Sequence, residues 1–285
     1  MFTRFARAVI PNAWKPTLKK WCGRKAADVD WWNHVLAPDG LFHWEDLVFD
    51  LRREPNTLFI RDEILVAGEY DFHTANTCVV LDIGMNIGDT PLYFARMPHV
   101  TKVYGFEPMH ATYEWAVANF KLNPKYNHKI VPTCAAVSDQ SGTTEIEFDY
   151  QEGTGGAAVE VVNDAHLSVI QGASYILKPG HSKRKQRINV LEAATLVADI
   201  LKQHPNEALV VKCDAEGAEW KIIPALLKAG LLDRIEVLMI EYHYRKPTDL
   251  LKILNDAGFV CFLRDLKHSK KVEVGNIYAS KTRCH

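Results

Sequence analysis

A glycine-rich turn bordered by carboxylates is the first feature of this sequence that could carry chemistry. Gly84 and Gly88 stand in the string LDIGMNIGDTPLYFA, between an apolar run and an amphipathic segment. Glycines at such a turn let the backbone approach a ligand at the carboxyl end of a parallel strand. Asp82 directly before the turn suits a cationic ligand and repels a pyrophosphate. The G-x-x-x-G spacing also differs from the G-x-G-x-x-G of dinucleotide sites.

A second carboxylate ends the next apolar run, VYGFEP. Glu107 follows Gly84 by about twenty residues. A carboxylate in this place can accept charge-assisted hydrogen bonds from both hydroxyls of a ribose. A surface glutamate at a strand end is the alternative. The pairing of the turn with Glu107 favours a cofactor that contains adenosine.

A third acidic group occurs in KCDAEGAEW. Asp214 closes a buried run, and Glu216 and Glu219 follow it at the start of a helical segment, where carboxylates can also act as simple helix caps. The next apolar run ends in IEYHY and adds Glu241 and His243 to the same edge. A histidine near carboxylates can be a general base, a metal ligand or a hydrogen-bonded structural residue.

Composition restricts the class of protein. Of the 285 residues 47% are hydrophobic and 24% charged, and 34 Lys and Arg balance 35 Asp and Glu. This indicates a globular chain without the overall basicity of many nucleic-acid binders. The six cysteines are widely separated and no short Cys or His pairs occur, so we expect reduced cysteines and no metal site. Without a bilayer-length apolar run or a signal-peptide core, we expect a soluble, cytoplasmic protein.

The N-terminal segment is an exception to this balance. Residues 1–25 contain seven Lys and Arg and no acidic residue, mixed with aromatic and aliphatic side chains. Such a segment can lie peripherally on an anionic membrane surface, and a solvated helix pair is the alternative. A further helix is predicted over Arg61–Gly68. We expect residues 1–70 to form an N-terminal helical extension.

From Thr77 onward, short apolar runs alternate with helix-length amphipathic segments. This pattern is typical of an α/β fold with a mainly parallel sheet and helices on both faces. Residues 143–149 alternate like a half-exposed strand, and Tyr150–Gln186 reads as an insertion. The expected strands are 77–84, 102–108, 129–137, 207–215, 235–243, 258–265 and 275–280, and the expected helices are 89–96, 110–121, 193–203, 217–229 and 248–257. We expect seven strands over residues 71–285, the last one antiparallel.

Four separated motifs in this order resemble the FkbM family of S-adenosylmethionine-dependent methyltransferases. They are VVLDIGMNIGDTPLYFA, VYGFEP, AAVSD and VVKCDAEGAEWKIIPALL followed by MIEYH. The resemblance implies a class I methyltransferase with a Rossmann-like fold and S-adenosylmethionine as its cofactor. It assigns cofactor binding to Asp82, Gly84, Met85, Asn86, Gly88, Glu107, Pro108, Ala136 and Val137.

The same resemblance implies O-methylation of a sugar, a glycan or a glycosylated small molecule. Asp214, Glu216 and His243 are then the candidate catalytic or acceptor-binding groups. The sequence lacks the [DNS]-P-P-[YFW] string of base-amine methylation and a Pro-Cys nucleophile, which disfavours a nucleic-acid acceptor. A nucleotide-dependent oxidoreductase and a non-catalytic methyltransferase-like scaffold are the alternatives.

Overall fold

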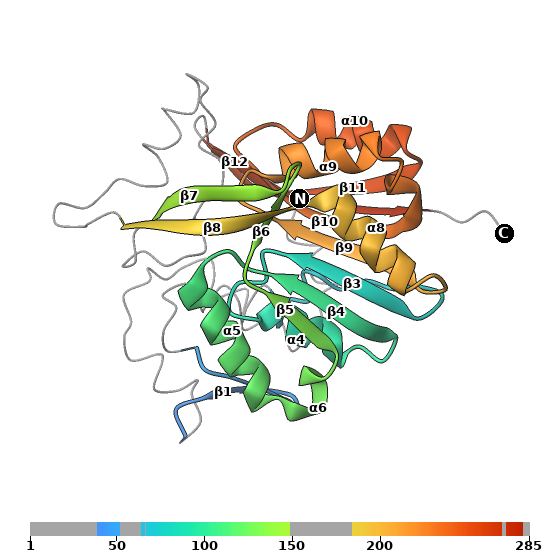
Figure 1. Ribbon diagram of the computed structural model, residues 1–285. Coiled ribbons are helices and arrows are strands. Elements are labelled where there is room, and N and C mark those ends of the chain that lie inside the picture. Colours follow the sequence, from blue (N-terminus) through green and yellow to red (C-terminus); the bar gives the residue numbers. More distant parts are fainter. Residues whose placement is uncertain (1–38, 52–63, 66, 149–183, 270–271, 282–285) are drawn as a thin grey trace, which may run out of the picture. The chain divides into compact units, whose positions relative to one another are not determined.

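A seven-stranded sheet forms the centre of the described chain (Figure 1). The computed structural model describes residues 39–51, 64–65, 67–148, 184–269 and 272–281. The strand order is β11-β12-β10-β9-β3-β4-β5. The bounds are β3 Cys78–Ile83, β4 Val100–Phe106, β5 Ile130–Thr133, β9 Ala208–Asp214, β10 Ile235–His243, β11 Phe259–Ser269 and β12 Val272–Lys281.

Strands β5, β4, β3, β9 and β10 pair in parallel, and β12 pairs antiparallel with both β10 and β11. The predicted α/β class, the mainly parallel sheet and the final antiparallel strand are therefore confirmed. Strand β3 lies inside the sheet between β9 and β4, and all six of its residues are buried. Central parallel strands are covered on both faces, which explains the continuous apolar run in this part of the sequence.

Helices cover both faces of the sheet. Helices α8 (Ala193–Gln203), α9 (Glu219–Lys228) and α10 (Thr248–Asp256) lie together (Figure 1) and share one apolar core with Leu81 of β3. Asp82 points to the opposite face because successive side chains of a strand alternate.

Helix α4 (Asp89–Arg96) covers that opposite face, since its Thr90 hydroxyl donates to the Asp82 carboxylate at 2.5 Å. Its bounds are those predicted from the sequence. Helices α5 (His110–Leu122) and α6 (Pro124–Asn127) follow β4, and a short 3₁₀ turn, η4 (Leu232–Arg234), precedes β10.

A separate three-stranded sheet departs from the prediction. It contains β6 (Ala136–Ser138), β7 (Gly142–Phe148) and β8 (Arg184–Glu192) in the order β6-β8-β7. The single strand predicted over residues 129–137 is therefore wrong. The chain breaks after Thr133, and β5 and β6 belong to different sheets, since hydrophobicity alone does not show where a continuous apolar run changes its partner.

Strand β8 was missed, and residues 184–186 were assigned wrongly to the insertion. Ile188 and Val190 are buried, while Lys185 and Arg187 are exposed, so the strand has the period of two that the basic run obscured. Lys185 forms a salt bridge of 3.0 Å with Glu145 across the β7–β8 pair. The remainder of the insertion, residues 149–183, lies outside the described residues.

The structure describes the N-terminal region only in part. Residues 1–25 and half of the helix predicted over 61–68 lie outside the described residues. A two-stranded sheet contains β1 (Phe42–Trp44) and β2 (Leu47–Phe49). The compact unit that holds the central sheet begins at His43. In the described part of the chain, no helix is both long and apolar enough to span a bilayer.

The turn after β3 generates the first prediction. Gly84 has φ +81°, and a Cβ placed there would overlap the backbone carbonyl oxygen of Asp214. We expect Gly84→Ala to lower the free energy of unfolding by about 2 kcal/mol or more, because the left-handed backbone and the overlap both oppose a side chain. Urea denaturation measures this change.

Gly142→Ala is the matched control, because a Cβ at Gly142 meets nothing within 4 Å. We expect the control to change stability by less than about 1 kcal/mol. Equal stability of the two variants would show that the turn after β3 tolerates a side chain.

Candidate active site

A pocket that is partly open to solvent lies where β3, β4 and β9 end. The carboxyl ends of parallel strands are the usual ligand-binding edge of such a sheet. Backbone and side chains from four separate segments surround it. The lining residues are Ile83, Gly84, Asn86, Phe106, Glu107, Pro108, Met109, Ala135, Ala136, Val137, Asp214, Ala215 and Glu216.

The glycine turn folds back on the end of β4. The backbone amides of Gly84 and Met85 both donate to the carbonyl oxygen of Phe106 at 2.9 Å. Asn86 lines the pocket in a left-handed conformation, with φ +45°. The backbone of Gly84 therefore forms part of the pocket wall.

Met85 and Gly88 have packing roles behind the pocket. Met85 is fully buried, and its sulfur lies where a Cβ on Gly105 would stand. Gly88 has φ +86°, and a side chain there would collide with the Phe120 ring of α5. Both residues belong to the predicted cofactor set, and both shape the turn from its packed side.

A buried lysine, Lys212 on β9, holds the turn in place. Its side chain is 2% exposed, and its ammonium donates to the carbonyl oxygen of Gly84 at 2.5 Å. The same ammonium lies 3.4 Å from Asp82 and 3.5 Å from Asp214. It also lies 5.4 Å from the centre of the Tyr70 ring. One cation thus connects the glycine turn with the end of β9.

The pKa values of Lys212 and of the carboxyl groups around it depend on one another. Burial would lower the pKa of Lys212, but the neighbouring carboxylates, led by Asp82, raise it above its ordinary value. Burial raises the pKa of Asp82, and the Lys212 ammonium and the Thr90 hydroxyl act in the opposite direction. Asp82 therefore supports the turn from behind through Lys212. No role of Lys212 was predicted from the sequence, although a charged residue inside the buried run LVVKCD requires a partner.

Glu107 is a buried carboxylate on the pocket wall. It is 7% exposed, and one of its oxygens accepts a hydrogen bond from the Met109 amide at 2.8 Å. Burial raises the pKa of Glu107 to about 8, against the lowering effects of that amide and of Lys212. Hydrogen bonds from a ligand to the charged form would bring the pKa down again. Pro108, Ala136 and Val137, which belong to the predicted cofactor set, line the same pocket.

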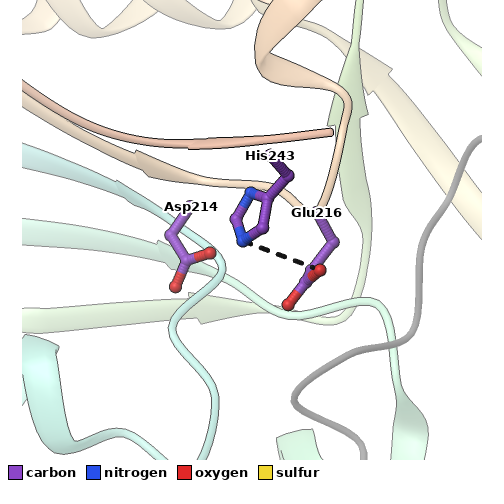
Figure 2. A group of neighbouring side chains, drawn as sticks. All are labelled: Asp214, Glu216 and His243. Atoms are coloured by element: carbon purple, nitrogen blue, oxygen red, sulfur yellow. Dashed lines mark ion pairs between the residues drawn. The ribbon is translucent and has the colours of Figure 1, made fainter. Parts of the chain in front are cut away.

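Asp214, Glu216 and His243 meet at the edge of the pocket, and Figure 2 shows their side chains pointing toward one another. One side-chain atom from each lies within 4.8 Å of the others. The His243 Nε2 atom is 3.7 Å from a Glu216 oxygen. Asp214 and Glu216 line the pocket with 28% and 22% of their side chains exposed, whereas His243 is 7% exposed.

Glu219 holds His243 in position. One of its oxygens accepts the backbone amide of His243 at 2.7 Å and lies 3.3 Å from the ring Nδ1. The other oxygen accepts the Gly217 amide at 2.8 Å. The Trp220 indole nitrogen donates to the carbonyl oxygen of His243 at 2.8 Å. Glu219 is fully buried, so it joins α9 to the end of β10 in addition to starting the helix.

The rim carries more carboxylates than cations. Glu241 lies 3.7 Å from His243 Nε2 on the side away from Glu219's contact with Nδ1. Burial raises the pKa of Glu216 to about 7 and that of Glu241 to about 8. Burial would lower the pKa of His243, but Glu216 and Glu219 raise it well above its ordinary value. The carboxyl groups of the rim therefore lie close together, and burial disfavours their charged forms.

The tertiary structure separates the predicted residues into three groups. Gly84, Asn86, Glu107, Pro108, Ala136 and Val137 line the pocket, as do Asp214 and Glu216. His243 stands beside Glu216, and Asp82, Met85 and Gly88 lie behind the turn. Sequence reasoning missed Met109 and Ala135 as wall residues, because their contributions depend on where β4 and β5 end.

A family model described as the methyltransferase FkbM domain matches residues 82–261. No curated protein matches the chain. An FkbM methyltransferase structure from Methylobacillus flagellatus KT is 15% identical, with a TM-score of 0.45, and the match covers 73% of this chain. The chain spans only 44% of that protein's length.

Two other similar structures are less alike. TYW2 from M. jannaschii, solved with AdoMet, is 14% identical over 85% of this chain and 86% of its own, with a TM-score of 0.39. The magnesium protoporphyrin IX methyltransferase of Synechocystis PCC 6803, solved with SAM, is 12% identical over 80% of each chain, with a TM-score of 0.39.

The family model covers more than half of the chain. It begins at Asp82 and continues through β10, so it includes the ends of β3, β4, β9 and β10 that form the pocket and its rim. This chain therefore belongs to the FkbM methyltransferase family.

Proposed function

We propose that this protein is an S-adenosylmethionine-dependent methyltransferase that methylates a hydroxyl of a sugar, a glycan or a glycosylated small molecule. The observation that carries the proposal is one pocket that joins the Gly84 turn and the buried Glu107 to the acidic rim of Asp214 and Glu216. S-adenosylmethionine supplies a methyl group already activated on a sulfonium. The chain must therefore bind the cofactor, orient the acceptor and remove a proton.

The pocket wall fits such a cofactor. One Glu107 oxygen is held by the Met109 amide, so the carboxylate has a defined orientation for accepting ribose hydroxyls. Ala136 and Val137 offer a small apolar surface to a flat base. The Asn86 side-chain oxygen is buried without a hydrogen bond from any described residue, and an amine or a hydroxyl of a ligand can satisfy it.

The rim fits the acceptor. Asp214, Glu216 and His243 come from β9, the following loop and β10, and their polar atoms converge beside the pocket. Such groups can hold a hydroxyl in line with the methyl group and take up its proton. Positioning can contribute on the order of 7 to 11 kcal/mol, and a general base a further 10²- to 10⁴-fold, about 3 to 5 kcal/mol. We infer that the main task of the rim is to orient the acceptor.

The direct test is transfer of an isotopically labelled methyl group. The protein is incubated with labelled S-adenosylmethionine and an extract of glycans and lipid-linked sugars, and the products are analysed by mass spectrometry. We expect the label on a sugar oxygen. Label found in RNA, or only in protein, would contradict the proposed acceptor class.

Asp214→Asn is the matched variant in this assay. We expect it to reduce the yield of product by about 10²-fold or more, because it removes a carboxylate that faces the acceptor. Calorimetry with S-adenosylhomocysteine is expected to give an unchanged affinity. If Asp214→Asn abolishes S-adenosylhomocysteine binding while turnover per bound cofactor is preserved, Asp214 belongs to the cofactor pocket.

Glu107 gives a prediction that links cofactor binding to stability. Its pKa of about 8 in the folded chain lies above the ordinary 4.5, so the folded chain keeps a proton that the unfolded chain loses. Without cofactor, stability therefore falls as the pH rises from about 4.5 to 8. We expect Glu107→Gln to stabilise the cofactor-free protein at pH 9 by as much as a few kcal/mol and to change little at pH 4.5.

The same substitution should weaken S-adenosylhomocysteine binding by about 1.5 to 3 kcal/mol, since a charge-assisted acceptor is lost. Urea denaturation at the two pH values and calorimetry measure the two effects. Glu114→Gln is the control, because Glu114 is an exposed carboxylate on α5. Unchanged S-adenosylhomocysteine affinity in Glu107→Gln would refute the ribose assignment.

The basic N-terminal segment suggests where the acceptor is found. We propose that residues 1–25 bring the enzyme to anionic membranes that carry lipid-linked sugars. Each cation near the surface can contribute about 1 kcal/mol, and salt screens the effect. We expect the full chain to sediment with anionic liposomes at low salt and a chain beginning at Ala26 to remain in solution. Equal sedimentation of the two chains would reject the membrane role.

A further inference from the structure

In the His243 ring, Nδ1 contacts Glu219, and Nε2 faces the carboxylates of Glu216 and Glu241. Glu219 lies 3.3 Å from Nδ1, and its oxygens already accept the backbone amides of His243 and Gly217. A carboxylate that accepts in this way places the ring hydrogen on Nδ1. Release of the Nε2 proton then leaves a lone pair that faces the carboxylates of Glu216 and Glu241. A carboxylate behind a histidine is the common support of a metal-binding imidazole.

Nε2 makes no hydrogen bond to any residue that the structure describes. Its nearest carboxylate oxygens, on Glu216 and Glu241, are both 3.7 Å away. A side-chain contact of about 3.6 Å or more is too long to be a hydrogen bond. Ligand atoms about 2.0 to 2.2 Å from one shared ion lie roughly 3 to 4.4 Å apart. The spacing at Nε2 is therefore too long for a hydrogen bond and suits an ion between the atoms.

The arrangement of the group also suits an ion. Asp214, Glu216 and His243 each bring one ligand atom into a region 4.8 Å across. Figure 2 shows the Asp214 and Glu216 carboxylates on two sides of the imidazole. Both carboxylates are partly exposed at the pocket, so an ion between them can be reached from solution and can keep open positions for other ligands.

The group is held in this arrangement by its surroundings. Glu216 has a left-handed backbone, with φ +48°, and the Tyr244 hydroxyl donates to its carboxylate at 3.2 Å. His243 is 5% exposed and is anchored through Trp220 and Glu219. Ligands that are already held in place favour metal binding, because the free energy of binding is then not used to order their side chains.

We propose that Asp214, Glu216 and His243 bind one divalent cation of the Mg²⁺ or Mn²⁺ class at the rim of the pocket, where the cation coordinates the acceptor hydroxyl. This inference rests on the proposed function and specifies how the rim holds its acceptor. A cation that coordinates a hydroxyl oxygen makes its proton more acidic. Two carboxylates and one imidazole are ligands that Mn²⁺ accepts readily, and the oxygen-rich set also suits Mg²⁺.

The expectation of no metal site rested on the absence of short Cys and His spacings. The ligands of this group come instead from the ends of β9 and β10 and the loop between β9 and α9. Parallel pairing sets Glu241 beside Asp214, which brings the two strand ends together. The expectation of no metal site is therefore replaced by this proposal.

Mn²⁺ binding to the full chain tests the proposal directly. The protein is treated with a chelator, dialysed and titrated with Mn²⁺, and free Mn²⁺ is followed by electron paramagnetic resonance. We expect one equivalent to bind, with affinity at least tenfold lower in Asp214→Asn and in Glu216→Gln. Asp256→Asn is the matched control, since Asp256 is an exposed carboxylate paired with Lys252 on α10, and it should bind like the wild type.

S-adenosylhomocysteine calorimetry on the metal-free proteins separates this inference from the proposed function. Retained S-adenosylhomocysteine binding in each variant shows that the variants are folded and that the cofactor pocket is intact. Weakened Mn²⁺ binding in both rim variants then supports the site. Absence of Mn²⁺ binding, or equal binding by the rim variants and the control, would overturn the cation site while leaving the cofactor assignment standing. Loss of S-adenosylhomocysteine binding in the wild type would contradict the proposed function itself.

Discussion

The Lys212 ammonium is the interaction on which the rest of the site depends. It lies at the centre of the sheet with 2% of its side chain exposed, and a buried cation is tolerated only with close compensation. Asp82 and Asp214 provide opposite charge from two neighbouring strands, and the Gly84 carbonyl oxygen provides a hydrogen bond. The glycine turn, the end of β3 and the end of β9 are therefore held as one unit.

This arrangement explains why two acidic residues near the pocket have different tasks. Asp82 is fully buried, and its two carboxylate oxygens contact the Thr90 hydroxyl and the Lys212 ammonium, so it stabilises the turn. Asp214 is 28% exposed, and it contacts Lys212 on one side while facing the pocket on the other. A single lysine thus lies between the glycine turn of the pocket wall and the rim for which acceptor binding is proposed.

A second anchor serves the rim. Glu219 is fully buried, and its two oxygens accept backbone amides from Gly217 and His243, which belong to different elements. Buried carboxylates that accept several amide hydrogen bonds form rigid, well-defined networks. Because Glu219 is itself held by two backbone amides, its contact with Nδ1 fixes the orientation of the His243 ring.

The sequence by itself determined most strands and helices of the central sheet and the chemical types at their ends. The run CVVLDI predicted a strand buried on both faces, and Gly84, Glu107 and Asp214 were recognised because each ends a strand of a parallel sheet. These features are local, since hydrophobic period and strand ends can be read along the chain. The turn, the cofactor wall and the membership of the rim were therefore accessible without coordinates.

Only the tertiary structure decided which of these side chains meet. Lys212 is one charge in an apolar run until β9 pairs with β3 and its ammonium reaches Gly84. β8 was hidden because its pairing with β7 joins two segments far apart in the chain. His243 Nε2 faces Glu216 because the buried Glu219 holds the other ring nitrogen, Nδ1. Distances between strand ends follow from sheet register and packing, which hydrophobic pattern does not encode.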